Sequence, residues 1–255
     1  MMSKKLKTAP NEKYVKEIVT DYDKLSERCN EFDLTKENKD VQEIVLALKN
    51  TIRANDGMLG LSANQIGYNK RILCLNFGGN IRSFINPIIT NAQGFELSRE
   101  TCSSIPGKTF IRTRNSKISV TYQTPLGKIE SVEFIGFAAI MFQHHIDHLD
   151  GLLLSDVSLE IDEDFDNATD EEREEVINMY LDSLDITRKE IETEIEKDTE
   201  AKQMSDAIKF MTSVKSGETI VEQQPLTDAE IEEIKKLLEE QKEKEDSEVN
   251  NKTEE

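Results

Sequence analysis

The sequence has no long apolar stretch. Its hydrophobic runs fall well short of the ~18 residues that a membrane-spanning helix needs, so we expect no membrane span. The first residues, "MMSKKLKTAPNEKY", contain lysines but no apolar segment of a secretory signal, which favours a cytoplasmic location. Cysteine is also scarce: Cys29, Cys74 and Cys102 lack the paired spacing of a disulfide framework. Reduced thiols are expected, and each cysteine is either buried and inert or a metal ligand.

Basic residues become scarce beyond the middle of the chain. Residues 1–150 hold 20 basic and 17 acidic side chains, a net charge of +3. Residues 151–255 hold the remaining 12 basic and 34 acidic side chains, a net charge of −22. Such a block repels phosphates, so no direct nucleic acid binding is expected. It is either a solvated tail, or it contacts a basic protein partner or folds back on the +3 domain.

The first 160 residues alternate between helical and strand-like patterns. Residues 13–56 are expected to be helical with polar breaks, and "RILCLNF", "RSFINPIIT", "KISVTYQT" and "KIESVEFIG" are expected to be strands. "FAAIMFQHHIDHLDGLLL" predicts an apolar helix that ends near Gly151, which is placed as a C-cap glycine. The first long helix should present one apolar face, made by Val41, Ile44, Val45, Leu48 and Ile52.

The pattern changes near residue 160. Thr169 with Glu172 and Thr227 with Glu230 each have the spacing of a capping box, which predicts two acidic helices. Between them, "VKSGETIVEQQP" is expected to be a linker, and "KEDSEVNNKTEE" a disordered end. We therefore expect a metal-binding domain over 1–160 and an acidic, mostly helical extension over 161–255.

Histidine is as scarce as cysteine, and all three copies lie in "FQHHIDHLDG", residues 142–151. On a helix, His144 and His148 are four residues apart and face the same way, which suits a metal ion. The alternative is a helix that merely carries histidines on a half-buried face. A third ligand is needed, and the thiolate of Cys102 would suit Zn²⁺ or Fe²⁺.

Three motifs extend this observation. "MLGLSANQIG", "ETCSS" followed by "IPG", and "QHHIDHLDG" resemble, in order, the motifs GxGLAAxQ, EGCLS and QHExDHLxG of peptide deformylases. The resemblance covers roughly residues 13–158. It implies an α+β fold, with antiparallel sheets around a central metal-binding helix. It also implies a metallohydrolase that removes the formyl group from N-terminal formyl-methionine of nascent polypeptides, with Fe²⁺ or Zn²⁺ bound by Cys102, His144 and His148.

The resemblance also implies how substrate is held. Gln65 and the backbone N–H of Ser103 would donate to the developing oxyanion, and Gly60 would lie along the substrate strand. A bound ion would lower the pKa of a coordinated water and polarise the formyl oxygen. The pocket for the methionine side chain would be lined by Leu59, Ile140 and Met141.

The chain departs from the motifs at the position of the general acid–base. The family has glutamate after the first ligand histidine, and this chain has His145. A neutral imidazole can move the same proton, but it is shorter and bulkier than glutamate. Met58 and Ser62 replace Gly and Ala of the first motif, and Thr101 and Ser103 replace Gly and Leu of the second.

Asp147 is retained, and we expect it to orient a ligand histidine or cap local backbone; the alternative is an ordinary exposed helix acid. Arg112 or Arg114 is expected to support substrate or loop geometry.

Three hypotheses follow. The first is an active deformylase in which His145 or an ordered water moves the proton. The second is a catalytically impaired descendant that binds metal and a peptide or protein partner. The third is a metal-free scaffold, which the retained ligand set argues against. The lost glutamate and the divergent tail also suggest a fast-evolving source, such as a virus of a bacterial host.

Overall fold

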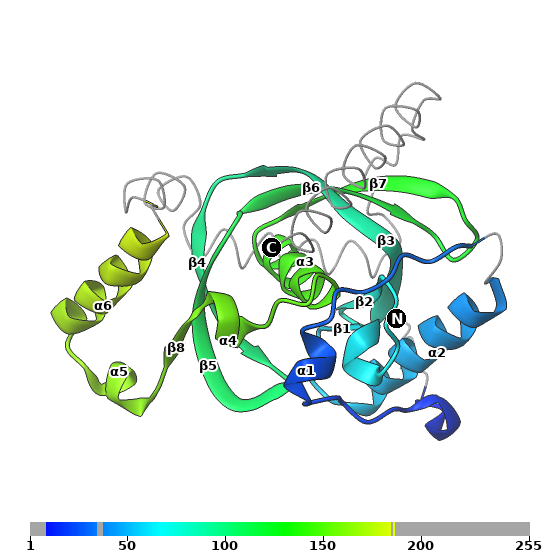
Figure 1. The fold of residues 1–255 in the computed structure, drawn as a ribbon, viewed down its shortest axis with the longest axis horizontal. Coiled ribbons are helices and arrows are strands. Elements are labelled where there is room, and N and C mark those ends of the chain that lie inside the picture. The colour runs from blue at the N-terminus through cyan, green and yellow to red at the C-terminus, as the bar shows by residue number, and fades with distance from the viewer. Residues whose placement is uncertain (1–8, 35–37, 185, 187–255) are drawn as a thin grey trace, which may run out of the picture.

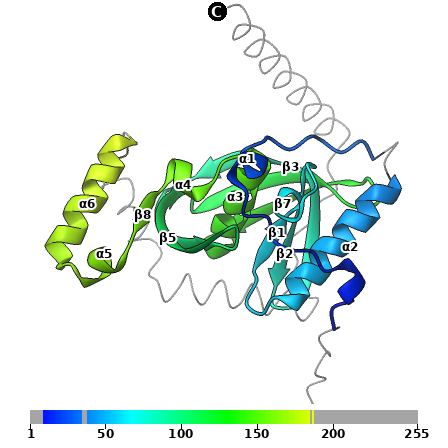
Figure 2. The same cartoon turned by 60° about the horizontal axis from the view of Figure 1, so that its bottom comes forward.

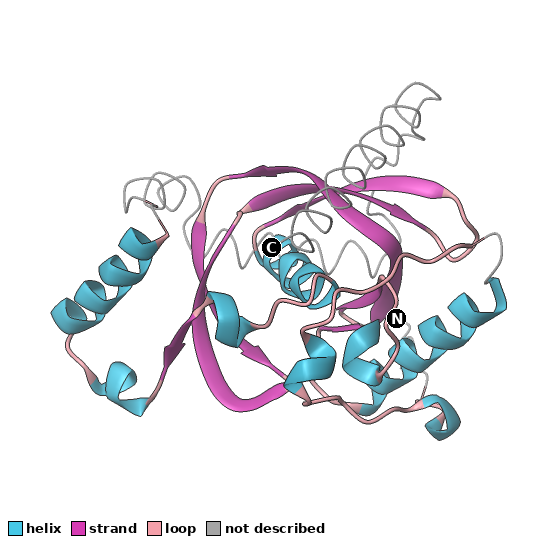
Figure 3. Cartoon of the chain, in the orientation of Figure 1, coloured by secondary structure: helices cyan, strands magenta, loops and turns pink. Residues whose placement is uncertain are grey.

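Two antiparallel sheets wrap around one helix in the computed structural model, which describes residues 9–34, 38–184 and 186. Helix α3 (Phe137–Leu149) lies inside the arc of the strands (Figures 1 and 3). The larger sheet has the order β1 (Gly60–Ser62), β2 (Ile72–Phe77), β3 (Asn80–Gln93), β6 (Lys117–Gln123) and β7 (Ile129–Ile135). The smaller sheet has the order β4 (Glu96–Cys102), β5 (Ile105–Arg114) and β8 (Leu159–Ile161). The expected α+β class and the four expected strands are confirmed.

The hydrophobic core lies on both faces of β2. Leu73 and Leu75 pack with α3, whereas Ile72 and Cys74 pack with α2 (Asn38–Ala54). Successive side chains of a strand point to opposite faces, so a strand covered on both faces is apolar at every position. Figure 2 shows β1 and β2 between the two helices. The apolar face expected for α2 is confirmed, because all five of its residues are buried.

The N-terminal segment is less helical than expected. Among the described residues before α2, the only helical segments are the short turns η1 (Glu12–Tyr14) and α1 (Tyr22–Leu25). The backbone between them bonds to other elements, as where the amide of Val19 donates to the carbonyl of Gln65 over 2.8 Å. The expectation of helix with polar breaks over 13–56 is therefore confirmed for α2 but wrong for most of residues 13–34, because tertiary hydrogen bonds replace the local ones there.

Helix α3 ends where the sequence predicts. Its C-cap is Asp150, and Gly151 follows with a φ of +76°. The amide of Leu152 donates to the carbonyl of Asp147 over 2.8 Å, which is the long hydrogen bond of a Schellman motif. A Cβ at Gly151 would lie 2.3 Å from the carbonyl oxygen of Ser26, so the N-terminal segment packs directly against this turn.

The acidic region begins with ordered structure. After α4 (Leu154–Val157) and β8 come α5 (Glu163–Asn167) and α6 (Asp170–Ser183). The capping box of Thr169 and Glu172 is confirmed at the start of α6. The boundary expected after residue 160 falls inside β8, which pairs with β5. The second capping box, the linker and the C-terminal end lie outside the described residues, and within those described no helix is long and apolar enough to cross a bilayer.

Candidate metal centre

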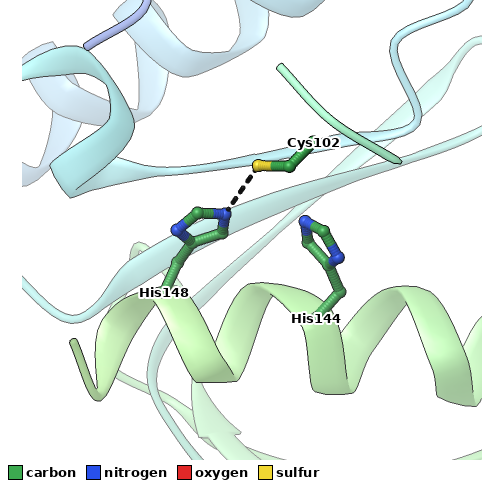
Figure 4. Close-up of side chains that lie close together, drawn as sticks. All are labelled: Cys102, His144 and His148. Carbon is green, nitrogen blue, oxygen red and sulfur yellow. Dashed lines mark hydrogen bonds between the residues drawn. The ribbon is translucent and has the colours of Figure 1, made fainter. Parts of the chain in front are cut away.

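Three side chains from two elements converge on one point. His144 and His148 project from the same face of α3, and Cys102 faces them from the end of β4 (Figure 4). One ligand atom from each lies within 4.8 Å of the other two, and Sγ of Cys102 is 3.2 Å from Nε2 of His148. The pairing of residues 144 and 148 expected from helical spacing is therefore present, and the third ligand type lies beside it.

The segment around Cys102, "SRETCSSIPG", is polar and rich in turn-forming residues, but it forms a strand hairpin. β4 and β5 form a hairpin, and only Ser103 and Ser104 lie between them. β4 does alternate between buried and exposed positions, but its buried side includes the polar residues Glu96, Ser98 and Glu100. Alternation of hydrophobicity is the usual signal for a half-buried strand, and buried polar side chains remove that signal.

The cluster has the electrostatics of a ligand set. Burial by itself raises the pKa of the Cys102 thiol, but hydrogen bonds from His144 and His148 outweigh it and lower the pKa to about 5. Burial likewise lowers the pKa of His144, but hydrogen bonds to Cys102 and Glu100 raise it to about 9. Cys102 is therefore a thiolate near neutral pH, which is the form that binds metals.

A buried ionic network supports His144. Oε2 of Glu100 lies 2.8 Å from Nδ1 of this histidine. Arg114 donates two hydrogen bonds to Glu100, of 2.8 and 2.9 Å, and a third to Asp147 over 2.5 Å. Burial raises the pKa of Glu100, but the bonds from His144 and Arg114 bring it well below its usual value. The carboxylate that orients the ligand is thus Glu100.

Asp147 therefore acts differently from either expectation. It makes no direct contact with a histidine ring, and instead it accepts from Arg114, the residue that holds Glu100. Its side chain is 19% exposed, so it is not an ordinary surface acid. Arg112 donates to the carbonyl of Val157 and so joins β5 to α4. Arg114 thus joins β4 to α3, the two elements that carry the candidate ligands, and a role of either arginine in substrate or loop geometry stays a prediction.

The residues fit a divalent metal ion. A thiolate and two imidazoles are the ligand types of Zn²⁺ and Fe²⁺ sites. A bond from Glu100 to Nδ1 of His144 leaves Nε2 for the ion, as is usual for a histidine ligand with a carboxylate behind it. Nδ1 of His148 is buried with no hydrogen-bond partner among the described residues, and its Nε2 faces the thiolate.

The other side of the site is built by β1 and the turn that follows it. Gln65 is 1% exposed; its Oε1 accepts from the amide of Ser62 over 2.9 Å, and its Nε2 donates to Ser104 over 3.2 Å. The same Nε2 is 3.8 Å from Sγ of Cys102, so its donor group lies beside the metal ligands. This fixed amide is suited to bind a developing negative charge.

His145 packs against β1, and its ring centroid is also 5.2 Å from that of His144 and 6.2 Å from that of His148. A Cβ added to Gly60 would lie 2.3 Å from Nε2 of His145, so the ring fills the space where a side chain would be. Burial and the charges of His144 and His148 lower the pKa of His145 well below its ordinary value. The imidazole is therefore neutral. It occupies the space beside Gly60 that a side chain at position 60 would fill, and His145 borders the cavity of the site.

One cavity of about 710 Å³ joins these groups. All of the residues assigned to catalysis or substrate from the sequence border it, and so do two of the three ligands. They are Leu59, Gly60, Gln65, Cys102, Ser103, Ile140, Met141, His144 and His145. His148 lies just behind this wall, against Cys102.

Comparison with known proteins identifies the arrangement. Residues 15–163 match the family described as polypeptide deformylase. The chain belongs to the polypeptide deformylase family. It is a deformylase-type hydrolase with a metal-binding site, and the region over 15–163 is called the deformylase region below.

Individual relatives support the same assignment. The chain is 38% identical over 129 residues to a peptide deformylase of Pelotomaculum thermopropionicum, which covers 51% of this chain and 81% of that protein. A peptide deformylase of Symbiobacterium thermophilum is 33% identical over 146 residues, covering 56% and 67%. The crystal structure of the Thermotoga maritima peptide deformylase has a TM-score of 0.53 and 30% identity, and covers 56% of this chain and 97% of that one.

Four residues around the site were not assigned from the sequence. Glu100 and Ser104 belong to the quoted motif "ETCSS", so the motif itself was the available signal. Phe137, the first residue of α3, borders the cavity beside Ile140 and is 42% exposed. The fourth is Ser62, whose contact with a residue 83 positions away has no signal in the local sequence.

Proposed function

We propose that this deformylase removes the formyl group from N-terminal formyl-methionine of nascent polypeptides, with His145 as the proton carrier. The observation that supports it most is the convergence of Cys102, His144, Gln65 and His145 on one cavity. Fe²⁺ or Zn²⁺ held by Cys102, His144 and His148 would polarise the formyl carbonyl and acidify a water. The cytoplasm, where polypeptides are synthesised, is the proposed location.

Substrate would bind along β1. This strand lies at the end of the larger sheet, so one of its edges is open, and Met58, Leu59 and Gly60 border the cavity there. An extended peptide can add to such an edge through its backbone. The methionine side chain would enter the apolar part of the cavity, which is bordered by Leu59, Phe137, Ile140 and Met141.

The chemistry is hydrolysis of an amide. The water oxygen attacks the formyl carbon while Nε2 of His145 takes a proton from the water. The charge that develops on the formyl oxygen is met by Nε2–H of Gln65 and the backbone N–H of Ser103. His145 then gives its proton to the nitrogen of the methionine as the C–N bond breaks. The products are formate and a free N-terminal amine.

The second candidate is a catalytically impaired protein that binds metal and a peptide or protein partner. The position of His145 favours it, because the ring fills the space on the face of β1 where a side chain of residue 60 would be, next to the proposed substrate edge. A bulky neutral ring at this place leaves less room for a substrate than glutamate would.

Turnover decides between the two. The purified full chain is loaded anaerobically with Fe²⁺ and given a formyl-Met tripeptide, beside Cys102→Ala and His145→Glu. Turnover well above that of Cys102→Ala supports the proposed function. Turnover by His145→Glu alone supports the impaired candidate, because it shows an intact metal site and oxyanion site that lack only the proton carrier.

We also propose that the acidic extension contacts a basic protein or folds back on the deformylase region, and does not dock on ribosomal RNA. Its described part is tied to the smaller sheet by the Arg99–Asp166 pair, whose two hydrogen bonds are both 2.8 Å. Ribosome co-sedimentation of the full chain and of a chain ending at residue 186 tests this. Tight binding that requires the tail would overturn the proposal.

A further inference from the structure

The hydroxyl of Ser62 makes two contacts with one residue of α3. Ser62 is the last residue of β1 and is fully buried. Its Oγ is 3.0 Å from the carbonyl oxygen of His145 and 3.1 Å from Nδ1 of the same residue. Two polar atoms of His145, its carbonyl oxygen and Nδ1, thus contact a single hydroxyl group.

The count of protons decides the direction of these bonds. A serine hydroxyl has one proton and two lone pairs, and a carbonyl oxygen only accepts. If the hydroxyl donates to the carbonyl of His145, its lone pair is free to accept a proton from Nδ1, and both contacts are satisfied. The carbonyl of His145 also accepts the helical hydrogen bond of α3, so it keeps a donor in either case. If Nδ1 had no proton, the single hydroxyl proton could serve only one contact: either the buried Nδ1 would lack a donor, or two oxygens would meet at 3.0 Å with no proton between them.

We propose that Ser62 is a positioning residue that fixes His145 as the Nδ1–H tautomer, with the lone pair of Nε2 facing the cavity. Nε2 is the nitrogen that lies against Gly60, on the wall shared with Gln65 and Cys102. The free lone pair is therefore at the atom that the proposed function uses as proton acceptor. The kinetic part of this inference rests on the proposed function, and the tautomer itself does not.

A second residue near the end of β1, Asn64, also binds the backbone of α3. Nδ2 of Asn64 donates to the carbonyl of His148 over 2.6 Å. The turn after β1 therefore binds the backbone of α3 at residues 145 and 148, one turn apart. These two bonds hold α3 against β1, so the position of the Ser62 hydroxyl relative to the imidazole of His145 is fixed.

Nitrogen NMR of the Zn²⁺-loaded full chain tests the tautomer without turnover. The chain has three histidines, so long-range ¹H–¹⁵N spectra of ¹⁵N-histidine-labelled protein contain three ring systems, and His145→Gln identifies one by its loss. We expect a protonated Nδ1 and an unprotonated Nε2 for His145. A protonated Nε2 in the wild type overturns the proposal.

Ser62→Ala tests the cause. We expect the Nε2–H form of His145 to become visible, whereas Ser83→Ala leaves the spectrum unchanged. Ser83 is a matched control because it is a buried serine of the same sheet whose hydroxyl meets Cys74 and not the site. An unchanged tautomer in Ser62→Ala overturns the proposal, and Ser62→Gly, which also lacks the hydroxyl, replaces it if that variant does not fold. Ser62→Thr, which keeps the hydroxyl, should keep the wild-type tautomer.

Kinetics separate positioning from mere structural support. Loss of such an orienting group lowers activity about 10-fold or more, so kcat of Ser62→Ala should fall with KM unchanged. In a His145→Glu background there is no tautomer to fix, and we expect the same change to alter kcat by less than about twofold. An equal loss in both backgrounds would show a structural role only. An inactive wild type with the expected spectrum would reject the proposed function and leave the assignment of Ser62 intact.

Discussion

The two sides of α3 hold adjacent histidines with different groups: an ionic network around His144, the ionic flank, and a neutral hydroxyl beside His145, the neutral flank. On the side of the smaller sheet, Nδ1 of His144 meets a carboxylate that is itself paired with Arg114. On the side of the larger sheet, Nδ1 of His145 meets a neutral hydroxyl. Burial lowers the pKa of His144, but hydrogen bonds to Cys102 and Glu100 raise it to about 9, whereas burial and the charges of His144 and His148 lower the pKa of His145. Under the proposed function, one helix would thus supply an anion-supported metal ligand and an uncharged proton carrier at successive positions.

Removal of the thiolate should have the largest effect on this comparison, because it takes away the one anionic ligand. Cys102→Ala should retain almost no metal after dialysis and should show deformylation at background level. Metal content by mass spectrometry checks this, with Cys74→Ala as the control, since Cys74 is fully buried in the core beside α2. Full metal retention in Cys102→Ala would mean that the ion binds elsewhere.

Loss of the proton carrier should come next. His145→Gln keeps a neutral side chain of similar length, so metal content should be unchanged while kcat falls about 10²–10⁴-fold. Steady-state kinetics with a formyl-Met tripeptide, beside metal analysis of the same sample, measure both quantities. Equal turnover in variant and wild type would place the proton transfer on another group.

Neutralising the ionic flank should affect both metal and fold. Glu100→Gln leaves the buried Arg114 with one carboxylate partner, Asp147, instead of two, which we expect to cost about 3 kcal/mol of unfolding free energy. Metal affinity should fall about 10–100-fold, because the carboxylate behind a ligand histidine is lost. Urea titration and competition with a chelator measure the two.

A surface ion pair serves as the control. Glu160→Gln breaks the pair with Lys108, in which both side chains are about half exposed, and should cost less than about 1 kcal/mol. Similar losses for Glu100→Gln and Glu160→Gln would show that the buried network adds nothing beyond surface electrostatics.

A methyl group at position 60 should disturb the neutral flank by a smaller amount. In Gly60→Ala the new Cβ meets His145 Nε2 at 2.3 Å and Leu75 Cδ2 at 2.6 Å, so the ring must move. We expect a loss of about 1–3 kcal/mol in unfolding free energy, which is typical of overpacking. His145→Ala in the same chain should recover part of it, and no recovery would mean that the contact with Leu75 decides the cost.

The smallest effect is expected where the extension meets the smaller sheet. Hydrogen bonds from Arg99 lower the pKa of Asp166, and the pair is about half exposed. A carboxyl whose pKa is lowered by folding stabilises the fold above its unfolded pKa, about 3.9, and loses this effect as the pH falls through the folded pKa. Hydrogen exchange of the backbone amides in α5 and α6 should therefore become faster in the wild type as the pH falls through the pKa of Asp166 in the folded state. Asp166→Asn should show faster exchange without this pH dependence.

The sequence predicted those parts of the fold in which hydrophobic periodicity is strong. Helix α2 with its buried face, the strands β2, β3, β6 and β7 of the larger sheet and the end of α3 at Gly151 all follow local patterns, whereas β1 was not predicted. β4 and β5 were not predicted, because the inner face of β4 is polar: Glu96, Ser98 and Glu100 are buried there by partners on other elements. The irregular N-terminal segment likewise depends on hydrogen bonds to distant backbone.

The candidate site likewise has a part that the sequence predicted and a part that it did not. The motifs and the helical spacing were enough to predict that Cys102, His144 and His148 form one metal site. The support of these residues was not predictable, because it depends on contacts between distant positions: Glu100 with Arg114, 14 residues apart, and Ser62 with His145, 83 apart. Asp147 illustrates the limit, since its neighbours in sequence are ligands and its partner in space is an arginine.

The double contact of Ser62 has a consequence for the history of the site. One of its two bonds goes to the backbone carbonyl of residue 145, and a backbone carbonyl is present whatever side chain that position carries. A serine could therefore arise at position 62 while a glutamate was still present at 145. The reverse order would bury the imidazole Nδ1 without a partner, at a cost of about 1–3 kcal/mol. The structure thus favours an evolutionary path with serine first and histidine second.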